Sequence, residues 1–297
     1  MGQANTYQYR MGDDTGNLRL AFMLNLVFCI VELFGGVFTN SIAIMADALH
    51  DLGDAFTLAL ALYFQKVSKK DCDCNFSYGY SRFSTLGSFF NGIILLVGSV
   101  FVLSATISRI AEPVMPNTHG VMVFSLLGLI INGSAFMAVR RSGEPVDASI
   151  KLHLMEDVWG WLVVLIGCLL MMTYQWAIID AVIALGITGF TLYNAFGMLN
   201  SSTRIMLQGV PTDLKHDEVK SYLLLHPHVS RVCDLHVWSI DGKSHVLTAK
   251  IITKDISTPT QIIEMRNHLK VELQKMNIHQ STIEMELESI SIHDNPE

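Results

Sequence analysis

Two stretches of the sequence pair a histidine with an aspartate four positions later. His50 and Asp54 form the first pair, and His153 and Asp157 form the second. Residues i and i+4 project from the same face of a helix, so each pair directs one imidazole and one carboxylate toward a common point. If the two helices face each other, these four ligands form a tetrahedral site that suits Zn²⁺ better than Mg²⁺ or Ca²⁺. The sequence therefore predicts a metal site at His50, Asp54, His153 and Asp157.

The segments that must position these pairs have the composition of membrane helices. Apolar residues make up 51% of the 297 residues and charged residues only 16%, whereas a soluble domain carries about 25% charged residues. A bilayer core is crossed by about 20 apolar residues in a helix. Polar groups inside such segments are typical of helices that line a polar pathway. Six segments are predicted to span the membrane: 18–38, 42–64, 83–107, 121–139, 152–172 and 176–196.

Each of these polar residues, taken alone, has a second interpretation. A single His or Asp in a membrane helix is often a hydrogen-bonding group between helices. The repeated spacing favours a metal site, because a carboxylate at the bilayer centre costs about 2.5–3.5 kcal/mol on insertion scales. Asp47, three residues before His50, either orients that imidazole from behind or is an inward-facing residue near the helix end. Asn91 is expected to make a packing hydrogen bond, and Asp180 is a candidate for the exit path of the metal.

The basic residues indicate how the helices are oriented. One set of loops is rich in Lys and Arg, whereas the other set offers almost only Arg109, which Glu112 counters. Basic loops stay in the cytoplasm, so both chain termini are expected there. Segment 1–17 is then a cytoplasmic N-terminal segment, and residues 18–200 form the membrane domain. The loop and loop-end positions that carry the positive charge are Lys66, Lys69, Lys70, Arg82, Arg140, Arg141 and Lys151.

A change of composition after residue 200 marks a second domain. The order helix, strand, strand, helix, strand predicts a small α+β sandwich over residues 208–290, followed by a tail at 291–297. The first helix is expected to be capped by Thr212 and Asp213. Asp241-Gly242 predicts a hairpin between the first two strands. The predicted elements are 212–226, 229–240, 244–253, 259–276 and 282–288.

Two further groups of residues have side chains that can bind metal. Cys72, Asp73 and Cys74 lie in a predicted cytoplasmic loop and either contact a soft metal ion or form an ordinary solvated loop. In the predicted sheet of the tail domain, a regulatory zinc site competes with an ordinary polar surface. Its candidate residues are Cys233, His236, His245, Glu284 and Glu286.

The sequence resembles the cation diffusion facilitators, in particular their bacterial zinc, cadmium and cobalt efflux branch. The resemblance covers nearly the whole chain and implies six helices per subunit, a homodimer and a cytoplasmic metallochaperone-like domain. It also implies that metal is exchanged for protons by alternating access, with the two His-x-x-x-Asp pairs as the transport site and zinc as the preferred ion. The matching residues are the run from Ser41 to Asp54, Tyr78-Gly79-Tyr80-x-Arg82, His153 with Asp157, Gly209-Val210-Pro211, and the run from Asp234 to Trp238.

Two positions depart from the family pattern. Ser84 stands where most relatives carry a Glu, and Gln208 stands where many carry an acid. The resemblance implies that an acid at position 208 pairs with Arg82 at the joint between membrane and tail. Gln208 keeps a hydrogen bond there but loses the charge, so the departure bears on the strength of the dimer hinge and on the coupling between tail and membrane domain.

A membrane transporter is the function that these features favour. The expectation is a metal/proton antiporter of a bacterial inner membrane that exports Zn²⁺, and also Cd²⁺ or Co²⁺, in a lipid environment, with His50 and His153 carrying the protons. Zinc is then the transported substrate and a regulatory ligand, and no organic cofactor is expected. Nucleic acid is excluded as a partner by the net charge of −7. Four protein ligands leave no open position for catalysis. The alternative is a membrane-anchored metal sensor whose tail reads zinc, which leaves the two ligand pairs without a role.

Overall fold

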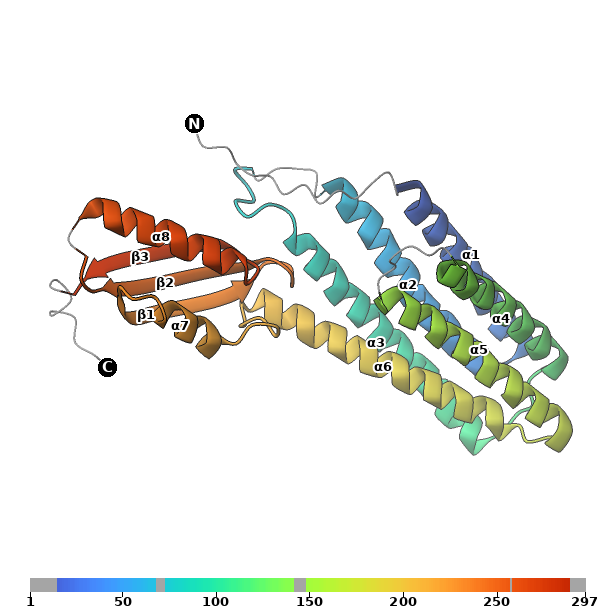
Figure 1. Cartoon of the computed structure of the whole chain (residues 1–297). Coiled ribbons are helices and arrows are strands. Elements are labelled where there is room, and N and C mark those ends of the chain that lie inside the picture. The colour runs from blue at the N-terminus through green and yellow to red at the C-terminus, as the bar shows by residue number, and fades with distance from the viewer. Residues whose placement is uncertain (1–14, 68–72, 142–147, 257, 289–297) are drawn as a thin grey trace. The chain divides into compact units, whose positions relative to one another are not determined.

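Six long helices make up most of the first two thirds of the chain and run side by side (Figure 1). The computed structural model describes residues 15–67, 73–141, 148–256 and 258–288. The chain separates into two compact units, one of residues 1–65 and 90–198 and the other of residues 66–89 and 199–297. The helices are α1 (Thr15–Thr39), α2 (Ile42–Val67), α3 (Arg82–Ala111), α4 (Thr118–Arg141), α5 (Ala148–Tyr174) and α6 (Ile178–Met206).

Five helices within the described residues are long and apolar enough to cross a membrane. They are α1, α3, α4, α5 and α6. Both ends of α1, α3, α4 and α5 lie within a few residues of the predicted segments, whereas α6 begins near its predicted start and ends ten residues beyond its predicted end. Helix α2 has 26 residues and is therefore also long enough. Its composition sets it apart, because it carries Asp47, Asp51 and Asp54. The predicted membrane domain is thus a helical bundle in which the charged helix is the one with the first ligand pair.

Hydrogen bonds from two other helices hold α2 in its place. At its first turn, the buried carboxylate of Asp180 on α6 accepts a hydrogen bond from the Ser41 hydroxyl at 2.5 Å and one from the Ile42 backbone N–H at 2.7 Å. Three turns further, the Asn91 amide on α3 donates to the Gly53 carbonyl at 3.0 Å and to Thr57 Oγ1 at 2.9 Å. Asn91 therefore makes the packing hydrogen bond predicted for it, whereas Asp180 caps a helix and has a structural role.

Glycines allow the helices to approach closely. A Cβ on Gly36 of α1 would lie 2.6 Å from Met45 Cγ of α2 and 3.0 Å from its backbone nitrogen. A Cβ on Gly128 of α4 would lie 2.2 Å from the ring of Trp161, a fully buried side chain of α5. At these two crossings only a residue without a side chain fits, so the backbones come close enough for interhelical packing without a hydrophobic driving force.

The tail domain is the predicted α+β sandwich. Its elements are α7 (His216–Leu224), β1 (Val229–Ser239), β2 (His245–Thr253), α8 (Pro259–Gln274) and β3 (Ile278–Leu287). The sheet order is β1-β2-β3, with β1 antiparallel and β3 parallel to β2. The parallel pairing is possible because α8 connects β2 to β3 and brings the chain back to the end of the sheet where β2 begins.

The two tail helices begin in different ways. A capping box starts α8, in which Thr258 Oγ1 accepts from the Gln261 N–H and the Gln261 side chain accepts from the Thr258 N–H. The predicted cap of α7 is wrong, because that helix begins at His216 after Lys215 and has no side-chain cap. Asp213 instead contacts His245 on β2, so its carboxylate serves a tertiary contact.

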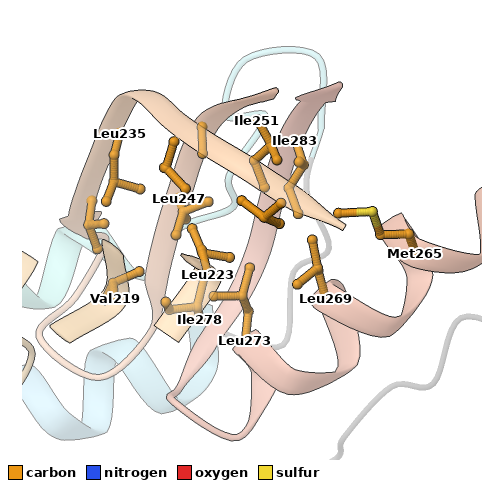
Figure 2. Close-up of a cluster of buried hydrophobic side chains, with 14 of the residues drawn as sticks. Val219, Leu223, Leu235, Leu247, Ile251, Met265, Leu269, Leu273, Ile278 and Ile283 are labelled. Atoms are coloured by element: carbon orange, nitrogen blue, oxygen red, sulfur yellow. The ribbon is translucent and has the colours of Figure 1, made fainter. Parts of the chain in front are cut away.

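The helices of the tail bury their apolar faces against the sheet (Figure 2). Val219 and Leu223 of α7 lie at i and i+4, and Met265, Leu269 and Leu273 of α8 continue the same spacing, so each set forms one stripe. The facing strand positions alternate along the chain, as in β2, where they include Leu247 and Ile251. This core holds the domain together independently of the membrane helices.

Candidate metal site

The first predicted ligand pair lies together on one face of α2. His50 Nε2 is 3.7 Å from Asp54 Oδ2, and the two side chains are 16% and 27% exposed. The ring of Phe190 on α6 meets the imidazole edge-on, with centroids 6.1 Å apart. The hydrogen bond from Asn91 to the Gly53 carbonyl fixes the backbone next to Asp54. An imidazole and a carboxylate are therefore held side by side, with partial access from solvent.

The second predicted pair belongs to α5, and its aspartate, Asp157, lies on the side that faces α2. A Cβ built on Gly160 of α5 would lie 3.8 Å from Asp47 Oδ1, which shows that this turn of α5 packs beside α2. Asp157 lies one turn earlier and interacts electrostatically with both Asp47 and Asp51. The backbone of His153 is helical within α5, but its side chain lies outside the described residues.

Acidic side chains surround the His50–Asp54 pair. Asp47 and Asp51 are each 8% exposed. Asp47 interacts with His50, Asp54 and Asp157, which places its carboxylate among the predicted ligands. Among the side chains that the structure describes, no group of three or more His, Cys, Asp or Glu is already gathered tightly enough to hold a metal ion. The donor set of imidazole and carboxylate nevertheless has the chemistry that a divalent transition metal binds.

One buried carboxylate near this site was missed in the sequence. Glu32 lies in the middle of α1 and is 0% exposed. It shares an inward stripe with the buried residues Cys29, Gly36 and Thr39, which follow the spacing of a helix face. The signal that could have found it is a single acid in an otherwise apolar membrane segment, which is a functional residue by default.

The loop between α2 and α3 gives one of its predicted metal residues a structural role. Asp73 accepts hydrogen bonds from the N–H groups of Asn75 and Phe76 at 2.9 and 2.8 Å, and from the Tyr80 hydroxyl at 2.7 Å. This last bond is the main reason that the pKa of Tyr80 is raised. Cys74 is exposed with a free thiol. Cys72 lies outside the described residues, so the proposed loop site stays a prediction.

The predicted tail site has a lysine at its centre. Cys233 on β1 pairs in register with Lys250 on β2, and Lys250 pairs with Glu284 on β3. Neighbouring strands lie about 4.8 Å apart, and β2 lies between β1 and β3, so the backbones of Cys233 and Glu284 are separated by about 10 Å. The Lys250 ammonium lies 2.9 Å from Glu286. A resident cation thus already neutralises one carboxylate at this position.

The two histidines of the predicted tail site, His236 and His245, lie at different positions along the β1–β2 pairing. His236 is exposed and pairs with Thr248, whereas His245 pairs with Ser239 at the start of β2. His245 is 1% exposed, and its Nε2 lies 3.1 Å from Asp213 Oδ2. The structure therefore does not gather Cys233, His236 and His245 at one point, and metal binding by the tail stays a prediction.

Arg82 and Gln208, the predicted hinge pair, make no hydrogen bond to each other in the described part of the chain. Arg82 lines a cavity of about 410 Å³ whose other walls include Phe76, Tyr78, Phe83, Ile205 and Met206. Gln208 has a positive φ of 57° just after α6, a conformation that usually belongs to glycine at helix ends. Ser84 donates to the Ser81 carbonyl at 2.7 Å, so its hydroxyl is used locally. The dimer hinge stays a prediction.

A helical membrane bundle that holds an imidazole–carboxylate pair inside, joined to a small α+β domain, defines a membrane protein that handles metal cations. The family model for the cation efflux transmembrane domain matches residues 18–207. The chain belongs to the cation diffusion facilitator family, a family of transporters, and to its zinc, cadmium and cobalt branch.

Curated relatives match the chain over nearly its full length. It is 31% identical to the cation efflux system protein CzcD of Alcaligenes sp. strain CT14, over 97% of this chain and 91% of that protein. It is 25% identical to the cadmium, cobalt and zinc/H⁺-K⁺ antiporter of Bacillus subtilis strain 168, over 97% and 94% of the two chains. It is 26% identical to the zinc transporter ZitB of Escherichia coli strain K12, over 91% and 86%.

Proposed function

We propose that this protein exports Zn²⁺ from the cytoplasm in exchange for protons, with Cd²⁺ and Co²⁺ as alternative substrates. The observation that carries the proposal is the His50–Asp54 pair, whose side chains lie 3.7 Å apart on α2, a helix of 26 residues that is long enough to cross a membrane. The names of the relatives, a zinc transporter and a cadmium, cobalt and zinc antiporter, support the same substrates. Burying this pair without a substrate would be costly in a bilayer.

In this proposal His50 and Asp54 of α2 hold the metal together with His153 and Asp157 of α5. Zinc binds a neutral imidazole and an ionised carboxylate, so loading releases the protons that the site held. After the metal leaves on the far side, protons neutralise the carboxylates, which avoids bare anions in a low dielectric during the return. Asp47 is proposed to hold His50 in position, because it interacts with both His50 and Asp157.

The proposed setting is the inner membrane of a bacterium, with both termini in the cytoplasm. The positively charged α2–α3 and α4–α5 loops support this orientation. The protein is proposed to work as a homodimer, with its tail domains in the cytoplasm. Cysteine crosslinking in native membranes tests the dimer, and labelling of Cys74 from one side of the membrane tests the orientation, because that thiol is exposed.

Zinc flux into proteoliposomes under an imposed pH gradient tests the transport site. Asp54→Ala and Asp157→Ala are expected to lower the rate at least about 100-fold, because each removes a charged ligand. Asp217→Ala is the matched control, since that carboxylate lies on α7 and its side chain is 98% exposed. Full transport by both ligand variants would refute the assignment, and a folded wild-type protein without flux would favour the sensor.

A further inference from the structure

A second acidic position lies beside the candidate metal site, on a different helix. Glu32 of α1 is 0% exposed, although α1 presents most of its other large side chains to the outside. Among the described residues no hydrogen-bond donor meets either of its carboxylate oxygens. Within the described part of the chain, the charged or titratable groups that interact with it are Asp51 and Asp47 of α2 and Cys29 of α1. No Lys, Arg or His is among them.

Contacts between α1 and α2 fix this arrangement. The Cys29 thiol donates to the Ala48 carbonyl at 3.3 Å, and the Ser41 N–H donates to the Gly36 carbonyl at 3.0 Å. Glu32 lies between these two contacts on the same stripe of α1. Its buried carboxyl group is therefore held against the acidic face of α2.

Two carboxylates in contact cannot both be ionised without a cation between them. An ionised carboxylate only accepts hydrogen bonds, so Glu32 and Asp51 attract each other only when a proton or another cation is shared. Burying an ionised carboxylate without a partner is so unfavourable that the group takes up a proton instead. Glu32, which has no basic neighbour among the side chains that the structure describes, therefore requires a bound cation in this conformation.

We propose that Glu32 is a proton-binding residue of the transport cycle, separate from the four metal ligands, with Asp51 accepting its hydrogen bond. This inference rests on the proposed function and adds a place for the counter-ion. Asp47 connects the two sites, since it interacts with Glu32 and also with His50, Asp54 and Asp157.

The direction of coupling follows from charge. An arriving divalent cation offsets the negative charge of the surrounding carboxylates, so the Glu32 O–H bond breaks and the proton passes to water. When the metal leaves, the carboxylates repel each other and Glu32 binds a proton again. Each turnover thus moves one proton at this residue against one metal ion, with no change in oxidation state.

The test is the count of protons released when zinc binds to the purified full-length protein in weakly buffered detergent. Glu32→Gln mimics the protonated group permanently and leaves the four ligands unchanged. We expect it to bind zinc within about threefold of the wild-type affinity and to release about one proton fewer per zinc ion. In proteoliposomes its zinc flux should lose most of its dependence on the pH gradient. Glu112→Gln, at an exposed carboxylate beyond α3, is the matched control and should behave as wild type.

Infrared difference spectroscopy of the wild-type protein provides a measurement that does not depend on a variant that folds. Zinc binding should remove the C=O band of one protonated carboxyl group. An unchanged proton count in Glu32→Gln, or no such band change in the wild type, overturns the inference. If the wild type itself neither binds nor transports zinc, the proposed function fails first.

Discussion

The cap that α6 places on α2 predicts a coupling between two residues 139 positions apart. Asp180 accepts hydrogen bonds from the Ser41 hydroxyl at 2.5 Å and from the Ile42 N–H at 2.7 Å, and it is 1% exposed. His50 lies nine residues after Ser41, which is about 13 Å along the helix. A shift at the start of α2 therefore moves the candidate metal ligand.

The expected magnitudes follow from the bonds that each substitution removes. A hydrogen bond to a charged group is worth about 1.5–3 kcal/mol in soluble proteins, and side-chain hydrogen bonds in membranes reach about 1.7 kcal/mol. Ser41→Ala removes the bond to Asp180 and the longer bond that Ser41 Oγ accepts from the Ile44 N–H at 3.3 Å, and should lower the free energy of unfolding by about 1–2 kcal/mol. Asp180→Asn should cost about 2–4 kcal/mol, because the amide keeps one acceptor atom in place of two and its NH₂ group is turned toward a donor.

Reversible unfolding in detergent, followed by tryptophan fluorescence, measures both variants and the double variant. The double variant should cost less than the sum of the two single variants by about 1 kcal/mol, because Ser41→Ala removes a bond that Asp180→Asn has already weakened. Zinc affinity, measured by titration calorimetry, should fall in the same order. Strict additivity, or a zinc affinity that does not change in Asp180→Asn, would refute the view that this cap positions the metal-site helix.

Two further predictions concern packing and pH. Gly128→Ala should cost about 1–3 kcal/mol of stability, because the new methyl group would lie 2.2 Å from the Trp161 ring. Gly133→Ala, on the same helix with no atom within 4 Å of the new Cβ, should leave the Tm unchanged or raise it, and equal losses in both variants would exclude the steric explanation. In the tail, burial and the neighbouring His268 and His228 lower the pKa of His226, so the folded domain favours the neutral ring. Stability should therefore fall as the pH drops below about 6.5, where the unfolded chain takes up the proton first. The protection factors of the α7 and α8 amides, which correct for the intrinsic pH dependence of hydrogen exchange, should be lower at pH 5.5 than at pH 7.5, and His226→Gln, but not His279→Gln, should reduce that difference.

A carboxyl group on α8 adds a second pH-dependent contribution to the stability of the tail. The Lys275 ammonium and the Tyr222 hydroxyl both bond to Glu272, which lowers the pKa of that carboxyl. Its contribution is therefore present above the ordinary carboxyl pKa and is lost as the pH falls through the lowered value. The tail thus loses two sources of stability on acidification, His226 first and Glu272 at a lower pH.

Local geometry explains why much of this protein was predictable from its sequence. Residues four apart share a helix face whatever the rest of the chain does, so His50 and Asp54 were expected together and lie 3.7 Å apart. Length and apolar content in the same way predicted the membrane helices, and Asp241-Gly242 predicted the hairpin between the first two strands of the tail. These properties depend on neighbours within a few residues along the chain.

Only the tertiary structure decided which side chains from different elements meet. Asp180 was a candidate for the exit path and became a helix cap, and Asp213 was expected to cap α7 but lies beside His245. Glu32 is not spaced with any ligand in the sequence, yet it lies against Asp51 of the next helix. The physical reason is that the rotation and crossing of packed helices depend on the fit of small residues such as Gly36 and Gly128 against distant partners, and no short stretch of sequence contains that information.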